Sequence, residues 1–245
     1  MPVISLICVS NDKEVLNECL IKSLSLQKGE LELIVIDNTE SVWHSAATAL
    51  NEGARKAKGD FLIFVHQDFI FESNNWLLDF VKFSNELESF GAAGVAGAAK
   101  NQGIVSNITH NWPIPVRVGY FEISKPIKVQ TLDECLISIP RTVFSRFPFD
   151  EGTCDNWHLY GVDLSLTVLE NGMNVYVLPL PGYHKSNGSS YTSGNYDRSL
   201  KLVLKKHRKS FRVIYTTCGN WSTGHSIIMQ KVLNGTISLL MKLKS

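Results

Sequence analysis

The chain has 245 residues, of which 44% are hydrophobic and 19% charged, and its formal net charge is +1. This length can bury one substantial core, so it fits one domain or one domain with a small appendage. No apolar run approaches the ~20 residues that a membrane-spanning helix needs, and no secretory leader follows Met1. The five cysteines form no C-x-x-C pair, which is typical of free thiols in a reducing compartment. We therefore expect a cytoplasmic protein.

The first third of the chain alternates between predicted strands and helices. Apolar runs predict strands at residues 3–9, 31–36 and 60–65. Between them, a helix capped by Asn11 or Asp12 should run to Gly29, and an alanine-rich helix should cover Ser41–Ala57. Strands that alternate with helices in this way require right-handed crossovers and a mainly parallel sheet flanked by helices.

The remaining elements are shorter and less regular. An amphipathic helix is predicted at 72–89, followed by a short strand at 95–98 and loops with short antiparallel strands at 100–127. The strand-like stretch 129–139 carries two acids, Asp133 and Glu134, that indicate either a solvated strand start or a functional position. The last predictions are a helix at 160–170, a strand at 174–178, a polar loop to residue 194, a basic helix at 195–211 and an amphipathic segment at 225–245.

Polar residues follow each of the first three predicted strands, as Asn11-Asp12, Asp37-Asn38 and His66-Gln67-Asp68. The carboxyl ends of parallel strands meet at one edge of a sheet, so these residues should form a polar rim where a nucleotide could bind. His66 and Asp68 are two residues apart and point to the same side, so they could hold a divalent cation or a ribose. Ordinary turn chemistry at a strand end is the alternative.

The motif search excludes two common nucleotide folds. No G-x-G-x-x-G follows the first strand, and no G-x-x-x-x-G-K-[ST] occurs anywhere in the chain. Their absence argues against a dinucleotide-binding fold and against a P-loop enzyme.

The charge is unevenly distributed. Residues 1–197 carry 14 basic and 23 acidic side chains, whereas the rest of the chain carries ten basic side chains and no acid. The tail should therefore contact something anionic, namely a membrane surface, a phosphorylated ligand or the acidic body of the protein itself. We divide the chain accordingly into residues 1–194 and a basic helical extension, 195–245. No nucleic-acid partner is expected.

The order of these segments resembles the GT-A fold of inverting, family 2-type glycosyltransferases. Three motifs, Phe64–Asp68, Trp157–Leu164 and His184–Ser189, are similar to a narrower branch typified by a streptomycin-biosynthesis glycosyltransferase-like domain, in which H-Q-D replaces the usual D-x-D. The resemblance covers about residues 3–190. It implies a metal-dependent enzyme that moves a sugar from a UDP- or GDP-linked donor to a hydroxyl acceptor, in a pathway such as polysaccharide biosynthesis.

The resemblance also implies roles for individual residues. Asp68, His66 and His184 would bind Mn²⁺ or Mg²⁺, and the two imidazoles would favour Mn²⁺ because Mg²⁺ prefers oxygen ligands. The residues expected to contact the nucleotide sugar are Ser10, Asn11, Asp12, Asp37, Asn51, His66 and Gln67.

The general base is harder to place. The family often has Glu-Asp before x-Asp-Leu, but this chain has Tyr160 and Gly161 at those positions. Asp163, Asp133 and His158 are the candidates, and Asp163 at the first turn of its helix could equally serve only to favour the helix dipole.

Three functions remain open at this stage. A glycosyltransferase is the leading hypothesis, and a non-catalytic nucleotide-sugar or glycan-binding protein on a degenerate GT-A fold is the second. A nucleotidyltransferase would need a Gly-rich basic loop after the first strand, and the segment after residue 9 lacks one. The acceptor could be a glycan, a lipid-linked saccharide or a small metabolite. Because the tail is basic, the protein could also lie on the inner face of an anionic membrane.

Overall fold

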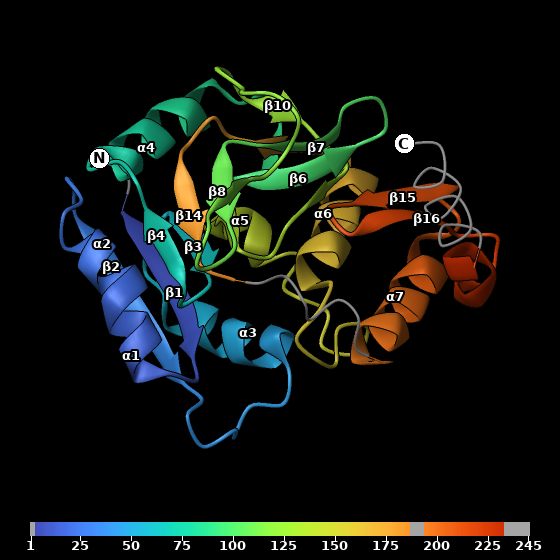
Figure 1. The fold of residues 1–245 in the computed structure, drawn as a ribbon, viewed down its shortest axis with the longest axis horizontal. Helices are drawn as coiled ribbons and strands as arrows, with labels where there is room; N and C mark the ends of the chain where they lie inside the picture. Colours follow the sequence, from blue (N-terminus) through green and yellow to red (C-terminus); the bar gives the residue numbers. More distant parts are fainter. Residues whose placement is uncertain (1–2, 187–193, 233–245) are drawn as a thin grey trace.

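A computed structural model describes residues 3–186 and 194–232. Its centre is a seven-stranded sheet in the order β10-β13-β5-β12-β3-β1-β2 (Figure 1). Only β12 and β10 run antiparallel to their neighbours in this sheet, which confirms the mainly parallel architecture. The strands are β1 (Ile4–Ser10), β2 (Leu31–Asp37), β3 (Phe61–Val65), β5 (Phe90–Gly94), β10 (Ile127–Lys128), β12 (Leu136–Pro140) and β13 (Asn174–Val177).

The sheet is covered on both faces, which explains why its central strands are apolar throughout. In β3, Ile63 and Val65 pack into one hydrophobic core, while Leu62 and Phe64 pack into a second core on the opposite face. The helices are α1 (Lys13–Val15), the π-helix η1 (Leu16–Ile21), α2 (Lys22–Leu24), α3 (Ala46–Lys56), α4 (Trp76–Glu86), α5 (Arg141–Phe144) and α6 (Tyr160–Glu170).

The helix expected from Ser41 begins later, at Ala46. Ser45 caps it, because its hydroxyl accepts a hydrogen bond from Thr48 N at 3.1 Å. Residues before it form a loop that the Asn38 side chain holds: its Oδ1 accepts from Trp43 N at 2.7 Å and its Nδ2 donates to Trp43 O at 3.1 Å. Sequence periodicity could not separate this loop from the helix, because the cap and the amide clamp depend on side-chain geometry.

Two small sheets lie beside the central one. Pairing of β14 (Gly182–His184) with β4 (Phe69–Phe71) places His184 opposite Phe69, directly after Asp68. This pairing brings the late histidine to the end of β3. The other strands of these sheets are β6 (Ala96–Ala99), β7 (Gly103–Ser106), β8 (Ile108–His110), β9 (Val116–Arg117) and β11 (Thr131–Leu132).

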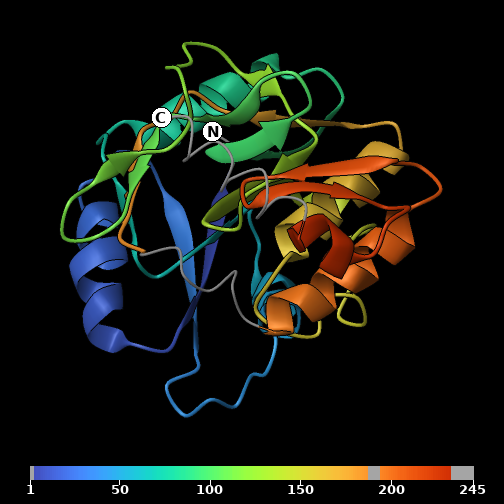
Figure 2. The same cartoon turned by 45° about the vertical axis from the view of Figure 1, so that its right-hand side comes forward.

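The basic extension packs on α6. It consists of α7 (Gly194–His207) and a hairpin of β15 (Val213–Thr216) and β16 (Gly219–Ser222), and both lie beside α6 in Figure 2. A third hydrophobic cluster joins them, and it includes Leu166, Leu200 and Trp221. Of the predicted 225–245 segment, residues 227–232 are helical, and residues 233–245 lie outside the described part of the chain. Among the described residues no helix is long and apolar enough to span a membrane.

Part of the tail's positive charge is neutralised inside the protein. Lys206 Nζ lies 2.9 Å from Asp150 Oδ2, and Arg198 forms an ion pair with Asp155. The acidic body of the protein, one of the three anionic partners considered for the tail, therefore contacts it in the structure.

Candidate functional site

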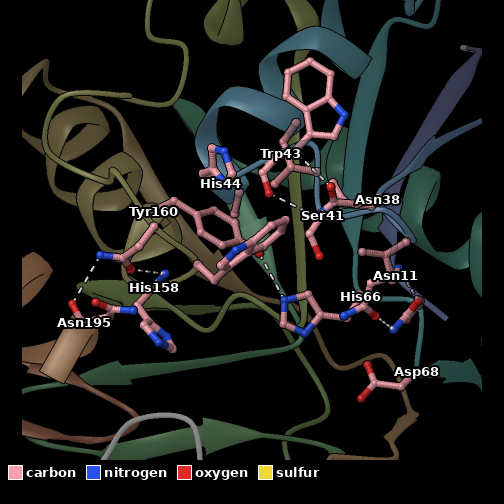
Figure 3. Close-up of a pocket in the computed structure, with 17 residues that line it drawn as sticks. Asn11, Asn38, Ser41, Trp43, His44, His66, Asp68, His158, Tyr160 and Asn195 are labelled. Carbon is pink, nitrogen blue, oxygen red and sulfur yellow. Dashed lines mark hydrogen bonds between the residues drawn. The ribbon is translucent and has the colours of Figure 1, made fainter. Parts of the chain in front are cut away.

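The expected polar rim lines a cavity of about 570 Å³ at the carboxyl ends of the three adjacent strands β3, β1 and β2 (Figure 3). The structure thus gathers these strand ends at one edge, as parallel pairing requires. The expected residues that line this larger cavity are Asn11, His66, Gln67, Asp68 and His158.

Gln67 ties the ends of β1 and β3 together. Its Oε1 accepts hydrogen bonds from Ser10 Oγ at 2.8 Å and from the backbone N–H groups of Asn11 and Asp12, both at 3.1 Å. Its Nε2 donates to Asn11 Oδ1 at 2.5 Å. The middle residue of the H-Q-D triplet therefore shapes the floor of the cavity, and its polar atoms already have protein partners.

His66, Asp68 and His184 converge, although His184 is far away in the sequence. His184 Nε2 lies 3.2 Å from Asp68 Oδ1 and 3.2 Å from His66 Nδ1. One potential ligand atom from each residue lies within 4.8 Å of the others. Two imidazole nitrogens and one carboxylate suit Mn²⁺ or a similar transition-metal cation better than Mg²⁺.

The electrostatics of this cluster suit a cation. Burial, with a smaller contribution from the neighbouring His184, lowers the pKa of His66 to about 4, so the ring is neutral at neutral pH and has a free lone pair. Burial alone would raise the pKa of Asp68, but hydrogen bonding and charge from His184 bring it to about 2. The same pairing raises the pKa of His184 against the opposing effect of burial.

The second nitrogen of His66 is held by α6. Its Nε2 lies 3.1 Å from the Tyr160 hydroxyl, which in turn donates to the backbone carbonyl of Glu134 at 3.4 Å. A partner on Nε2 fixes the ring orientation and leaves Nδ1 directed at Asp68 and His184, as in ordered metal sites. Figure 3 shows the contact between Tyr160 and His66.

A smaller cavity of about 400 Å³ adjoins the cluster, and it shares His66 and His158 with the larger one. His184, Asp133 and Glu134 also line it, together with Thr217 and Cys218 from the C-terminal hairpin. Both carboxylate oxygens of Asp133 are occupied: Oδ1 accepts from Cys135 N at 3.1 Å and Oδ2 accepts from Thr217 Oγ1 at 2.7 Å. Burial would raise the pKa of Asp133, but these bonds and the histidines lower it.

The placement of Asp163 corrects the first expectation for the base. Asp163 is 2% exposed and is not among the residues that line either cavity. Its Oδ1 lies 2.9 Å from His207 Nε2 and its Oδ2 lies 2.7 Å from Lys206 Nζ. Asp163 therefore anchors α7 to α6 and contributes to the lining of neither cavity.

Four residues expected at the nucleotide are absent from the lining of both cavities. Ser10 donates to Gln67, and Asp12 caps α1 by accepting from Glu14 N and Val15 N. Asp37 is exposed; Thr39 and Lys13 lower its pKa to about 2. Asn51 is buried.

Asn51 links α3 to the segment that follows α5, since it donates to Phe149 O at 2.9 Å and accepts from Phe149 N at 3.1 Å. The structure thus gives these four residues partners within the protein, and their contact with a nucleotide remains a prediction.

Asn38, which was expected in the polar rim, lines the larger cavity. Sequence reasoning missed several other residues that line the cavities: Ser41, Trp43, His44, Tyr160, Glu134, Thr217 and Cys218. Glu134 carried a signal, because an acid inside an apolar stretch is unusual. Trp43 was assigned to a helix, and the Thr217 turn was assigned no role, since its position depends on how the hairpin packs.

The sequence profile of the glycosyltransferase-like family matches residues 5–207. The chain belongs to this glycosyltransferase-like family. The matched region includes α7, so it extends past the boundary expected at residue 194. The division into two domains and the narrower streptomycin-type branch remain predictions. A search of curated proteins gave no match.

Solved structures confirm the GT-A fold of this glycosyltransferase-like protein. GalNAc-T7 with UDP, GalNAc and Mn²⁺ has a TM-score of 0.61 at 14% identity, over 83% of this chain and 48% of that one. The mannosyltransferase PcManGT from Pyrobaculum calidifontis, with GDP-Man and Mn²⁺, has a TM-score of 0.60 at 13% identity, over 86% of this chain and 65% of that one. Staphylococcus aureus TarS 1–349 with UDP-GlcNAc has a TM-score of 0.57 at 15% identity, over 83% of this chain and 66% of that one. The chain thus spans about half to two thirds of their lengths.

Proposed function

We propose that the protein is a metal-dependent, inverting glycosyltransferase that moves a sugar from a nucleotide diphosphate to a hydroxyl acceptor. The observation that carries this proposal is the convergence of His66, Asp68 and His184, of which the first two line the 570 Å³ cavity and the third lines the smaller one. Structures of similar fold hold UDP, GalNAc and Mn²⁺, GDP-Man and Mn²⁺, or UDP-GlcNAc, which supports ligands of the same kinds here.

The fit of a cation is judged from the donor set. The three side chains offer two imidazole nitrogens and the ionised carboxylate of Asp68. The Tyr160 hydroxyl already orients the imidazole of His66. Mn²⁺ accepts such mixed ligands. When bound, it would neutralise charge that develops on the departing diphosphate.

The two cavities then take different parts of the reaction. The larger one has the size and lining for a nucleotide, with Trp43 available to pack against a base and Asn11 and Asn38 at the strand ends. The smaller one adjoins the cation cluster and carries polar side chains such as Asp133 and Thr217 on an otherwise largely apolar lining, so it suits the acceptor. Attack from that side, opposite the diphosphate, would invert the anomeric configuration.

The experiment is a thermal-shift titration with Mn²⁺ and UDP or GDP, followed by measurement of nucleotide release from UDP-GlcNAc, UDP-GalNAc and GDP-mannose. A ligand that binds the folded state raises the midpoint, by an amount equivalent to about 2.7 kcal/mol at 100 times its Kd. Asp68→Asn and His184→Asn should lose the Mn²⁺-dependent shift. Asp79→Asn on α4, outside both cavities, is the matched control.

A second candidate, a non-catalytic nucleotide-sugar-binding protein, is favoured by one observation. Tyr160 and Gly161 stand where a Glu-Asp pair was expected from the resemblance. Binding of nucleotide without release from any donor would favour this alternative. Absence of nucleotide binding would contradict both candidates.

Any membrane contact remains a proposal of the same kind. Exposed basic residues of α7, such as Lys201 and Lys205, could bring the protein to an anionic cytoplasmic surface that carries a lipid-linked acceptor.

A further inference from the structure

The proposed reaction needs a group that removes the acceptor proton, and two of the expected acids are already engaged. Asp163 has both oxygens in a buried ion pair, and Asp133 has both oxygens hydrogen-bonded by Cys135 and Thr217. Against the effect of burial, hydrogen bonds and the nearby histidines lower the pKa of Asp133, so Asp133 is a weak base. A stronger base should have a free oxygen, face the acceptor cavity and favour its protonated form.

Glu134 has these features. It lines the smaller cavity, and its Oε1 is buried without a hydrogen-bond partner among residues 3–186 and 194–232. Neighbouring contacts fix the backbone around it: Leu132 N donates to Ser165 Oγ at 3.1 Å, and Tyr160 Oη donates to the Glu134 carbonyl at 3.4 Å. Glu134 is therefore placed by α6, the same helix that orients His66.

Gly161 makes room for this carboxyl group. A Cβ at position 161 would lie 3.3 Å from Glu134 Cγ and 2.6 Å from Ile137 Cδ1. The side chain of Glu134 thus packs over the start of α6, where a larger residue would crowd it. Position 161 on α6 therefore carries no acid, and the carboxyl group beside it comes from Glu134, in the segment between β11 and β12.

The surroundings favour the protonated form. Burial raises the pKa of Glu134 to about 8, Asp133 contributes in the same direction, and the N–H groups of Gly161, Leu159 and Val162 oppose both. The other titratable groups around it are Cys135 on its own segment, Tyr160 on α6, Tyr196 on α7, Cys154 and Cys218. A carboxylate with this affinity for a proton can accept one from a hydroxyl near neutral pH.

We propose that Glu134 is the general base of the transfer, and this inference rests on the proposed function. The acceptor oxygen forms its bond to the anomeric carbon while its proton moves to a Glu134 carboxylate oxygen. The bond from the anomeric carbon to the diphosphate oxygen breaks, and its electron pair leaves with the nucleotide diphosphate. The proton then passes to solvent.

The first test compares Glu134→Gln with wild type and with Glu72→Gln, an exposed glutamate outside both cavities. The probes are Mn²⁺ with UDP or GDP for binding, and UDP-GlcNAc, UDP-GalNAc and GDP-mannose with water as acceptor for turnover. We expect Glu134→Gln to bind nucleotide as wild type does and to release it at least about 100-fold more slowly. Glu72→Gln should match wild type in both.

The pH profile separates Glu134 from His158, which lines both cavities. A base acts when deprotonated, so the wild-type rate should rise with pH until about 8, the pKa of Glu134, and Glu134→Gln should lose that rise. Burial lowers the pKa of His158 below 6.5, so a rise confined to lower pH and retained in Glu134→Gln would assign the proton to His158 and overturn the inference.

Gly161→Ala provides a second variant if Glu134→Gln folds poorly. The added Cβ should displace the Glu134 side chain, so turnover should fall about tenfold or more with nucleotide binding retained. Turnover within threefold of wild type in both variants would contradict the role of Glu134 and leave the proposed glycosyltransferase function unaffected. A wild-type protein that binds no nucleotide, or binds without turnover, would contradict the proposed enzyme and this inference with it.

Discussion

Replacing Asp163 by Asn tests whether this residue anchors α7 or takes part in catalysis. The Asp163 side chain is 3% exposed, and each of its oxygens has a nitrogen partner, Lys206 Nζ at 2.7 Å and His207 Nε2 at 2.9 Å. Asparagine keeps the shape of the side chain. It removes the charge, and it turns an amide NH₂ toward a group that is itself a donor.

The magnitude follows from burial. Removing one member of a buried ion pair costs about 3–5 kcal/mol, because the partner is left uncompensated. Lys206 keeps a second partner, Asp150, and is 31% exposed, so the lower end is expected. For a domain of this size each kcal/mol lowers Tm by about 2–4 °C, so a loss of about 3 kcal/mol corresponds to about 6–12 °C.

The assay is thermal and urea unfolding of Asp163→Asn beside Asp150→Asn, which removes a carboxylate from the solvent side of the same lysine. Asp150 is 38% exposed, an exposed pair contributes at most about 1 kcal/mol, and an asparagine Oδ1 can still accept from Gly152 N and Thr153 N, so the control should lose less stability than Asp163→Asn. At 20 °C, where both variants are folded, their rates of nucleotide release should be within threefold of wild type. A stable Asp163→Asn protein with turnover reduced 100-fold would refute the anchoring role.

Three further predictions follow from other contacts. Gln67→Ala removes the acceptor of three hydrogen bonds, so it should lower the unfolding free energy by about 1–3 kcal/mol and weaken nucleotide binding, as measured by urea unfolding and titration; unchanged values would contradict its clamping role. Trp43→Ala should weaken UDP or GDP binding at least tenfold in isothermal titration with little change in Tm, and equal affinity would remove it from the nucleotide cavity. The basic extension should bind anionic vesicles weakly at low salt and release them near 0.5 M salt, and equal partitioning to neutral vesicles would exclude an electrostatic contact.

Sequence reasoning succeeded where local pattern and topology decide the structure. The apolar run of β3 and its polar end predicted a buried parallel strand that delivers His66 and Asp68 to one edge, and the structure places them there. His184 could be linked to them only through the resemblance. The contact itself depends on the pairing of β14 with β4, which no short-range pattern specifies.

The sequence was least informative about polar side chains with two plausible roles. Asp163 in the first turn of a helix fits a catalytic acid as well as it fits an ion pair, and only the packing of α7 distinguishes them. Asn51 and Asp12 illustrate the same limit, since one clamps a loop and the other caps a helix. The burial and partners of each acid are tertiary properties.

The hairpin that carries Thr217 reaches back to Asp133, so the wall beside the reacting centre is supplied by a segment that follows the family-matched region. Under the proposed function, exchanging residues 213–222 between relatives would therefore be a route to altered acceptor preference. Removing only this hairpin would take Thr217 and Cys218 out of the wall of the smaller cavity and leave His66, Asp68 and His184 in place.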